Sequence, residues 1–481
     1  MYFKKMNKQF YLVTLLLLFS CRGNYLDLSK DKVFSEANDR SEFYNEENVL
    51  VRVDAMSPWW TSLGDRAFED YVEEMVENNY SFQGAYERMI QAKENYNIAR
   101  GGFWPSVSSN ISAKRSITPT NSLGFGFGGD SKIYNTNYTA DVAASWQLDF
   151  FGKIKNSTKS ARKNYESSKY DIAALKHSLI ADLFKGKISI ALYRDLLDLA
   201  KDNLLDKQDI YDLVKRRYDL GVSALNDVYE AKSNLNKSEI DVSTYAKALE
   251  AEIYLFQALI GRLPNKSELD LNDFDLVDLP QEVVSCVSAG LVDRRPDLRS
   301  LRLKVSAANS DIKVAVADLY PDVSISASAG FSGNKSSELF DIDQLASSLS
   351  GNIATKIFQG GILRANIRLK KSALKEKVAN YVGAIVDSVA EVETLLKNEV
   401  ELEKEFASRL DSEFLMTKNA EFKQVRYEKG IESLQGYLLA NEVKYSAQRD
   451  LLLKWRERWD NRVNLYLALG GDWDNLNQCK K

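Results

Sequence analysis

The chain has 481 residues, of which 44% are hydrophobic and 27% are charged, and its formal net charge at pH 7 is −4. This composition is that of a folded protein, and it argues against a nucleic-acid binder, which would normally carry a basic face. One histidine and three cysteines, at positions 21, 286 and 479, leave almost no room for a multi-histidine metal site, a catalytic triad or a disulfide framework. We therefore expect no cofactor, no bound metal and no catalytic residue.

The first 20 residues are typical of a secretory signal peptide. Lysines precede an apolar run from Phe10 to Phe19, which is too short to span a membrane. The run leads into Leu18-Phe19-Ser20-Cys21, which resembles a bacterial lipobox, so Cys21 is the predicted lipidation site and residues 21–60 form a lipid-anchored segment. The alternative is cleavage by the ordinary signal peptidase, which would leave Cys21 as a free thiol.

The rest of the chain is a tandem repeat. The motif Arg-Tyr-x-x-Gly ends at Gly221 and again at Gly430, an offset of 209 residues that also relates Gly152 to Gly361. Upstream, Trp104-Pro105 corresponds to Tyr320-Pro321 at an offset of 216 residues. A period this long indicates a duplicated unit and not a solenoid of short modules. The predicted parts are a first repeat at 61–261, a linker at 262–293, a second repeat at 294–470 and a tail at 471–481.

Both repeats have the same predicted order of elements: a helical segment, two strands and a long helical hairpin. The helical segments are expected at about 62–101 and 296–318, the strands at about 104–115, 136–150, 321–331 and 345–358, and the hairpins at 152–261 and 361–470. Apolar and polar residues alternate most strictly from Tyr138 to Phe150. This pattern by itself favours a half-buried strand of a soluble sheet. The export signal makes a transmembrane strand, with one face toward lipid, a comparable alternative.

The two hairpins are predicted to be continuous helices. No proline occurs between 120 and 263 or after 321, and proline would interrupt a helix interior. Apolar residues recur every three or four positions, as in a coiled coil. An arm of some 65 residues would extend about 100 Å, a length that suits a duct or strut between two membranes.

Four strands cannot close a membrane barrel, because single-chain barrels begin at about eight strands. An open sheet in lipid would leave its edge backbone groups without hydrogen bonds. If these strands cross a membrane, several chains must therefore combine them. Two chains would supply eight strands and three would supply twelve, and the strand count does not choose between them.

The order and spacing of many short motifs resemble the TolC-like outer-membrane efflux factor family, in its lipoprotein branch (the OprM and NodT type). The motifs include Trp59-Trp60, Asn78-Asn79, Trp104-Pro105, Asp149-Phe150-Phe151-Gly152-Lys153, Arg217-Tyr218-x-x-Gly221, Arg294-Arg295-Pro296-Asp297-Leu298 and Leu319-Tyr320-Pro321. The resemblance implies an α+β membrane protein that forms a homotrimer. Its twelve-stranded transmembrane β-barrel, with four strands per chain, would continue into a long periplasmic α-helical barrel.

The resemblance also gives roles to the turns of the two hairpins. Arg217, Tyr218 and Gly221, with Arg426, Tyr427 and Gly430, become the candidates for docking a periplasmic adaptor protein. Each glycine is independently expected to end its helix in a left-handed conformation. Next to these turns, Glu432, Asp227 and Glu230 are candidates for a channel constriction, since three copies of a carboxylate around an axis would attract cations. The alternative is that they are solvated helix charges.

The function implied is a passive exit duct in the cell outer membrane, lipid-anchored and extending into the periplasm. An inner-membrane pump of the resistance-nodulation-division (RND) type would supply the energy, and a periplasmic adaptor would join pump to duct. Two alternatives stay open: the same duct serving type I protein secretion or metal efflux, and a coiled-coil lipoprotein scaffold without a pore. A hydrolase is the least favoured class, and no nucleic-acid partner is expected.

Overall fold

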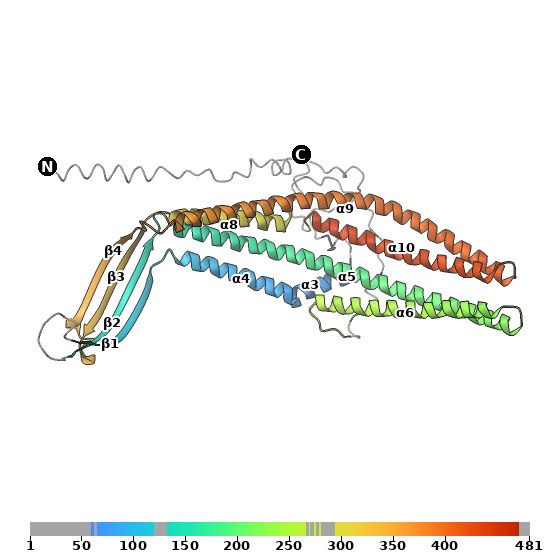
Figure 1. Cartoon of the computed structure of the whole chain (residues 1–481), viewed down its shortest axis with the longest axis horizontal. Helices are drawn as coiled ribbons and strands as arrows, with labels where there is room; N and C mark the ends of the chain where they lie inside the picture. The colour runs from blue at the N-terminus through green and yellow to red at the C-terminus, as the bar shows by residue number, and fades with distance from the viewer. Residues whose placement is uncertain are drawn as a thin grey trace. The chain divides into compact units, whose positions relative to one another are not determined.

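The computed structural model describes residues 59–61, 65–119, 132–265, 269, 274–275, 279 and 294–470 (Figure 1). The predicted signal peptide, Cys21, Cys286, Cys479, the tail and most of the linker lie outside these residues. The chain forms two compact units. One, the sheet unit, comprises Glu74–His177 and Pro296–Tyr381. The other, the hairpin unit, comprises Ser178–Arg295, the residues up to Glu73 and those from Val382 onward.

The two repeats contain matching elements. In chain order the first contains α3 (Arg66–Asn78), α4 (Tyr80–Gly101), β1 (Ser106–Pro119), β2 (Lys132–Leu148), α5 (Lys153–Asp219) and α6 (Leu225–Leu259). The second contains α8 (Pro296–Ala317), β3 (Asp322–Gly333), two 3-10 turns (Ser336–Glu338 and Ile342–Gln344), β4 (Leu345–Ala354), α9 (Ile362–Glu428) and α10 (Leu434–Ala468). Helices α5 and α9 have 67 residues each, and α6 and α10 have 35 each. The bounds of both pairs differ by 209 positions, so the offset predicted from glycines holds for whole helices.

The helical segment that we predicted as one piece at 62–101 is two helices. Asn79 separates α3 from α4 with an extended backbone, and its side-chain oxygen accepts a hydrogen bond from the backbone N–H of Phe82 at 2.9 Å. An asparagine that satisfies a backbone donor in this way starts a new helix and does not continue the old one. Whether an asparagine caps a helix depends on the backbone conformation around it, which the sequence alone does not show.

The strands form one antiparallel sheet in the order β1-β2-β3-β4, so β2 and β3 join the two repeats. Strand β1 extends to Pro119, beyond the predicted end near 115, and β2 begins at Lys132, before the predicted 136. Pro119 pairs with Lys132 at the end of the ladder, where a residue without an N–H is tolerated. Strand β4 ends at Ala354 and leaves the predicted residues 355–358 outside the sheet.

Each face of the sheet has its own chemistry. One row of directly paired residues crosses all four strands through Ile111, Ala140, Phe331 and Leu345, and the rows on this face are mainly apolar. A row on the opposite face runs through Ser108, Ala143, Ser328 and Ser348, with Ser328 and Ser348 hydrogen-bonded at 2.8 Å. Most of the large apolar side chains, among them Val107, Ile111 and Leu349, are exposed in the single chain.

The motif at 149–153 fixes the elbow between β2 and α5. The backbone N–H groups of Ile154 and Lys155 donate to the Asp149 carboxylate at 3.0 and 2.7 Å, which caps the helix. The ring of Phe151 stacks on that of Tyr320, with centroids 4.8 Å apart. Lys153 Nζ lies 2.8 Å from the carboxylate of Asp318, so the first repeat is tied to the end of α8 in the second.

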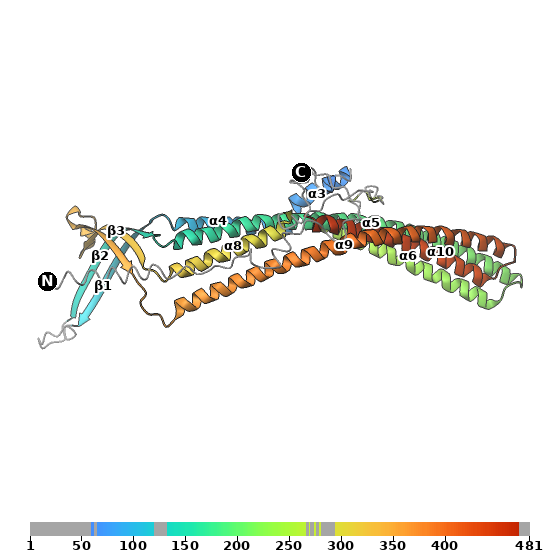
Figure 2. The ribbon, with the colours of Figure 1, turned by 90° about the horizontal axis from the view of Figure 1, so that it is seen from above.

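The first part of α5 has a neighbour on either side within the sheet unit, α4 and α8 (Figure 2). The Thr158 hydroxyl donates to the carbonyl of Ala99 in α4 at 3.0 Å. Toward α8, the hydroxyls of Ser167 and Ser300 are hydrogen-bonded at 2.8 Å, and both side chains are buried. These small hydroxyls allow close helix packing while satisfying each other's polar groups.

The core of the hairpin unit is aromatic. Trp59 stacks on Tyr466 at 5.1 Å and meets Phe184 edge-on at 5.4 Å, and Phe184 in turn contacts Trp459. Trp59 and Trp459 are among the largest fully buried side chains among the described residues. This cluster joins α5 and α10 to the short segment that precedes α3, and edge-on aromatic pairs of this kind stabilise beyond the area they bury.

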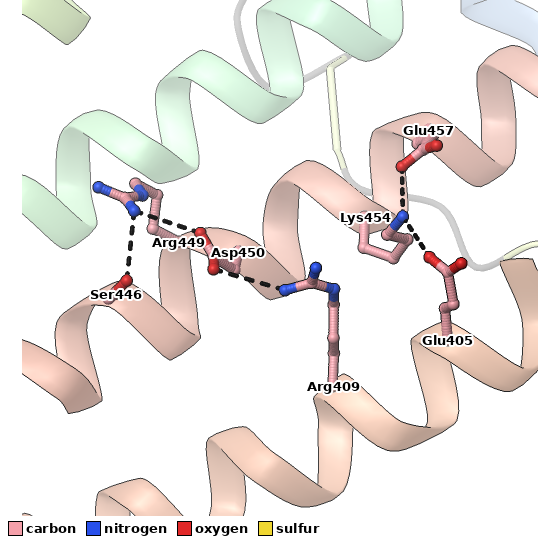
Figure 3. A network of polar contacts seen from close by, with 7 residues as sticks. All are labelled: Glu405, Arg409, Ser446, Arg449, Asp450, Lys454 and Glu457. Carbon is pink, nitrogen blue, oxygen red and sulfur yellow. Dashed lines mark hydrogen bonds and ion pairs between the residues drawn. The ribbon is translucent and has the colours of Figure 1, made fainter.

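Ion pairs hold α9 against α10 along the second hairpin (Figure 3). Lys454 Nζ lies 2.6 Å from the Glu405 carboxylate and 2.5 Å from that of Glu457, and Arg409 reaches Asp450 at 3.4 Å. Nearer the aromatic core, the buried Arg462 donates to Glu399 at 2.5 Å. The exposed pairs contribute little individually, whereas the buried Arg462–Glu399 pair would be costly to break, because it would leave a charge without its partner.

At Gly330 on β3, a side chain larger than glycine does not fit into the sheet. A Cβ added at Gly330 would lie 2.6 Å from both the carbonyl oxygen of Ala140 and the Cβ of Asp141 on β2. We expect Gly330→Ala to separate β2 from β3 and to lower the yield of folded, protease-resistant protein several-fold, since overpacking typically costs about 1–3 kcal/mol. The matched control is Gly351→Ala on β4, where nothing lies within 4 Å of the added atom. Equal yields from the two variants would contradict the prediction.

Candidate functional site

The two hairpin turns lie at the same end of the hairpin unit (Figures 1 and 2) and are built in the same way. In the first, Gly221 has φ +74°, its N–H donates to the carbonyl of Tyr218 at 2.8 Å, and the N–H of Val222 donates to that of Arg217 at 2.8 Å. In the second, Gly430 has φ +72° and the same two bonds run to Tyr427 and Arg426 at 3.0 and 2.9 Å. Both are Schellman caps, so the expected left-handed glycines are present.

Arg217 and Tyr427, two of the predicted docking residues, join the turns to each other. The guanidinium of Arg217 lies over the Tyr427 ring, 4.4 Å from its centroid, and also donates to the Tyr427 carbonyl at 3.3 Å. Tyr427 stacks on Tyr437 at 5.4 Å inside a small apolar cluster of Ile210, Val214, Ala231, Tyr427, Tyr437 and Leu438. These two residues therefore hold the two hairpins together, whereas Tyr218 is exposed.

The Glu432 carboxylate, in the turn between α9 and α10, is folded back against the end of α9. It accepts a hydrogen bond from Lys423 Nζ at 2.6 Å, lies 3.6 Å from Nε of Arg426, and the side chain is only 15% exposed. The bond from Lys423, helped by the two positive charges, lowers the pKa of the Glu432 carboxyl below its usual range, so it is ionised at neutral pH. Gly436 leaves room for the Glu432 carboxylate, because a Cβ at position 436 would lie 2.5 Å from Oε1 of Glu432.

The other two predicted constriction residues lie at the first turn in different settings. Asp227 accepts from the Ser223 hydroxyl at 2.7 Å and from the backbone N–H of Ala224 at 3.1 Å, so its carboxylate closes the start of α6. Glu230 is exposed on α6. At the second turn Ser433 takes the capping role, accepting from the N–H of Gly436 at 3.0 Å. The two turns therefore have the same backbone and different charge arrangements.

The turns also present apolar side chains that the sequence did not single out. Leu220 is 78% exposed, Val222 75% and Ile431 61%. They flank the two left-handed glycines, where no helical periodicity predicts burial, so the available signal was the presence of large apolar residues in a tight turn. Exposed apolar residues gathered at one end of a unit are typical of a surface that another protein covers.

Arg295 has a structural role. Its Nη1 lies 2.7 Å from the Glu391 carboxylate and 3.4 Å from the carbonyl of Ala468 near the end of α10. Pro296 begins α8, where the missing N–H costs nothing. Among the described residues there is no cluster of three histidine, cysteine or acidic side chains placed to hold a metal ion. The helices within the described ranges all lack the combination of length and apolarity needed to cross a bilayer.

The comparison with known proteins gives the family. The family model described as "Outer membrane efflux protein" matches residues 71–261 and 290–471, which is more than half of the chain. The chain belongs to this family. A match in two stretches agrees with a tandem repeat. The family resemblance inferred from the motifs is thereby confirmed.

Individual relatives of this outer membrane efflux protein cover most of its length. The probable efflux pump outer membrane protein TtgC of Pseudomonas putida is 26% identical over 423 residues, covering 86% of this chain and 85% of the relative. Nodulation protein T of Rhizobium leguminosarum bv. viciae is also 26% identical over 423 residues, with 87% and 84% covered.

Solved structures show the same fold. The outer-membrane channel OprN superposes with a TM-score of 0.82 at 23% identity, covering 91% of this chain and 97% of that one. The CmeC outer membrane channel of Campylobacter jejuni has a TM-score of 0.80 at 20% identity, with 88% and 90% covered. The predicted architecture of tandem repeats, each with two strands and a long helical hairpin, is therefore that of this group of channels.

The Glu432 ion pairs generate a prediction about the second turn. Glu432→Gln removes the charge that holds Lys423 and Arg426, so we expect faster amide hydrogen exchange over residues 423–434 at pH 7. Because the folded-state pKa is lowered, the stabilisation is present at neutral pH and disappears as the pH falls through that pKa. Wild type and variant should therefore converge only at pH values below the usual carboxyl range. Glu428→Gln, an exposed change in the same turn, is the control and should exchange like wild type.

Proposed function

We propose that this chain is the outer-membrane exit duct of a tripartite efflux system and that three copies form it. The observation that carries the proposal is the four-stranded sheet, with one apolar and one polar face and an unpaired edge on each side, joined to two long helical hairpins. Small molecules would pass through the duct without chemical change. The relatives named as efflux pump outer membrane proteins support this direction of transport.

The unpaired edges support assembly into a barrel. Strands β1 and β4 each have a neighbour on one side only. In lipid their outer backbone groups would have no hydrogen-bond partner, and one chain has too few strands to close on itself. If β1 of one chain pairs with β4 of the next, three chains give a closed barrel of twelve strands. The apolar faces then meet lipid, and the serine-rich faces line a polar lumen.

The hairpins support the same cyclic arrangement. Within one chain α10 contacts both helices of the first hairpin: Lys444 Nζ lies 3.6 Å from the Asp206 carboxylate on α5, and Tyr445 lies next to Tyr245 on α6. Helices α6 and α9 instead carry exposed apolar side chains that share a face: Tyr229, Ile240 and Leu255 on α6, and Leu410, Phe414 and Val425 on α9. Contact of α6 with α9 of the next chain would cover both stripes, and because the two surfaces differ, the contact propagates around a ring.

The turns would face the periplasm and dock the adaptor. We assign this role to the surface formed by Tyr218, Leu220, Val222 and Ile431 around the glycines. Arg217, Arg426 and Tyr427 shape this surface from beneath. The adaptor would connect the duct to an inner-membrane pump, which we propose to be of the RND type. We also propose acylation of Cys21, which would anchor the chain to the outer membrane independently of the barrel.

Small molecules are the favoured cargo over secreted proteins or metal ions. One relative, at 26% identity, is the toluene efflux pump outer membrane protein TtgC of Pseudomonas putida. For the constriction we keep Glu432, Asp227 and Glu230 as candidates. Glu230 is the exposed carboxylate of the three, so its copies would contribute most to cation preference around an axis.

Planar bilayer recordings test the duct. We expect purified wild-type protein to form trimers with a steady ionic conductance, and Glu230→Gln to lower the preference for cations over anions more than Glu432→Gln does. Ile240→Glu with Phe414→Glu should abolish trimers, because it places charges in both apolar stripes. Leu205→Glu, an exposed apolar position on α5, is the control and should assemble normally. If lipase alone released the protein from membranes as a monomer without conductance, the result would instead support the alternative of a coiled-coil lipoprotein scaffold without a pore.

A second variant tests docking apart from assembly. Val222→Asp with Ile431→Asp places carboxylates on the apolar surface of both turns, where an adaptor hairpin would have to desolvate them. We expect drug efflux from cells to fall at least about tenfold, which corresponds to about 1.4 kcal/mol of lost association, while trimers and conductance stay normal. Leu205→Asp serves as the control for an added surface charge. Efflux at the wild-type level in the double variant would contradict the assignment of adaptor docking to this surface.

A further inference from the structure

The apolar face of the sheet carries charge at one end only. Within the described strands this face includes two charged residues, Arg115 on β1 and Lys132 on β2, and both are cations with exposed side chains. Lys114, next to Arg115, points to the opposite, polar face, as the alternation of a strand requires. Both outward cations lie toward the β1–β2 hairpin end of the sheet, the end opposite the elbow at 149–153.

The position of Arg115 coincides with the end of the apolar band. Along β2 the outward residues are apolar from Leu148 through Tyr138, and Thr136 is the first polar one, directly opposite Arg115. Leu148 and Thr136 are twelve positions apart. At about 3.3 Å per residue and a strand tilt of about 40°, this stretch rises about 30 Å, which is close to the hydrocarbon thickness of a bilayer. Arg115 therefore lies where hydrocarbon ends and headgroups begin.

The side chains around Arg115 prepare it for an anion. Its Cζ lies 5.4 Å from the centroid of the Tyr134 ring, and Tyr134 belongs to the outward face. A ring on one side of a guanidinium holds it in place and leaves its edge N–H groups to donate, an arrangement suited to the oxygens of a phosphate. Lys132, two outward rows beyond Arg115 and opposite Pro119, adds a second positive charge on the same side of the sheet.

We propose that Arg115 and Lys132 of each chain bind the phosphate groups of the phosphorylated glycolipid that forms the outer leaflet of the outer membrane. The inference rests on the proposed function, because the barrel orientation places the hairpin end of the sheet in that leaflet. Charge complementarity carries the choice of occupant, since this face of the described strands has cations and no acids. The bound glycolipid would seal the outer rim of the barrel and fix its depth in the membrane.

The test uses purified full-length trimers in a zwitterionic detergent, titrated with lipid A and analysed by native mass spectrometry. We expect Arg115→Gln with Lys132→Gln to weaken lipid A binding by about thirtyfold, taking about fivefold for each cation near an anionic surface. Lys114→Gln removes the same charge from the polar face of the same strand and should bind like wild type. Lipid A stripped of its phosphates should bind wild type as weakly as phosphorylated lipid A binds the double variant.

Several outcomes would overturn the inference. These are equal lipid A binding by wild type and the double variant, a loss in Lys114→Gln as large as in the double variant, and equal binding of lipid A with and without phosphates. If phosphatidylglycerol bound as tightly as lipid A, the assignment to the glycolipid would be overturned. Bilayer conductance of the same trimers separates the two proposals. Conducting trimers with unchanged lipid A binding refute the lipid site alone, whereas wild-type protein without trimers or conductance refutes the proposed duct and this site with it.

Discussion

The unsatisfied edges of a four-stranded sheet are the constraint on which the rest of this molecule depends. A sheet with one apolar face can enter lipid only if every backbone group finds a partner, and β1 and β4 each lack one neighbour. Association of copies would satisfy both edges at once, and in the proposed ring it would also cover the apolar stripes of α6 and α9. Membrane insertion and assembly of the helices would then both depend on association of the chains. Association supplies backbone hydrogen bonds to the sheet and apolar packing to the helices.

The duplication makes this arrangement possible. Each repeat supplies two strands, and the β2–β3 pairing joins one repeat to the other. The elbow is built across the same junction, where Phe151 stacks on Tyr320 and Lys153 pairs with Asp318. A motif of the first repeat is therefore satisfied by residues of the second. Neither repeat alone would have both a paired sheet and a fixed angle between its strands and its long helix.

The hairpin turns show where duplicated sequences have diverged without changing the backbone. Gly221 and Gly430 have nearly the same φ, and both turns make the same pair of carbonyl bonds. The charges differ: Asp227 caps its helix from within, whereas Glu432 folds back onto Lys423 and Ser433 caps in its place. Around a threefold axis, such a pair of turns would present six equivalent backbones with two alternating charge patterns.

The sequence alone determined the repeat, the helical hairpins with their glycine turns, the four alternating strands and the family, because each depends on local spacing or on motifs that survive in linear order. The break at Asn79 and the reach of β1 to Pro119 were missed, since periodicity does not show where a side chain caps a helix or where a ladder continues. Only tertiary structure could show that Arg217 lies on Tyr427, that Glu432 is paired with Lys423, and that Arg115 and Lys132 share one face at one rim. Those facts depend on which residues distant in sequence are brought together, and folding alone decides that.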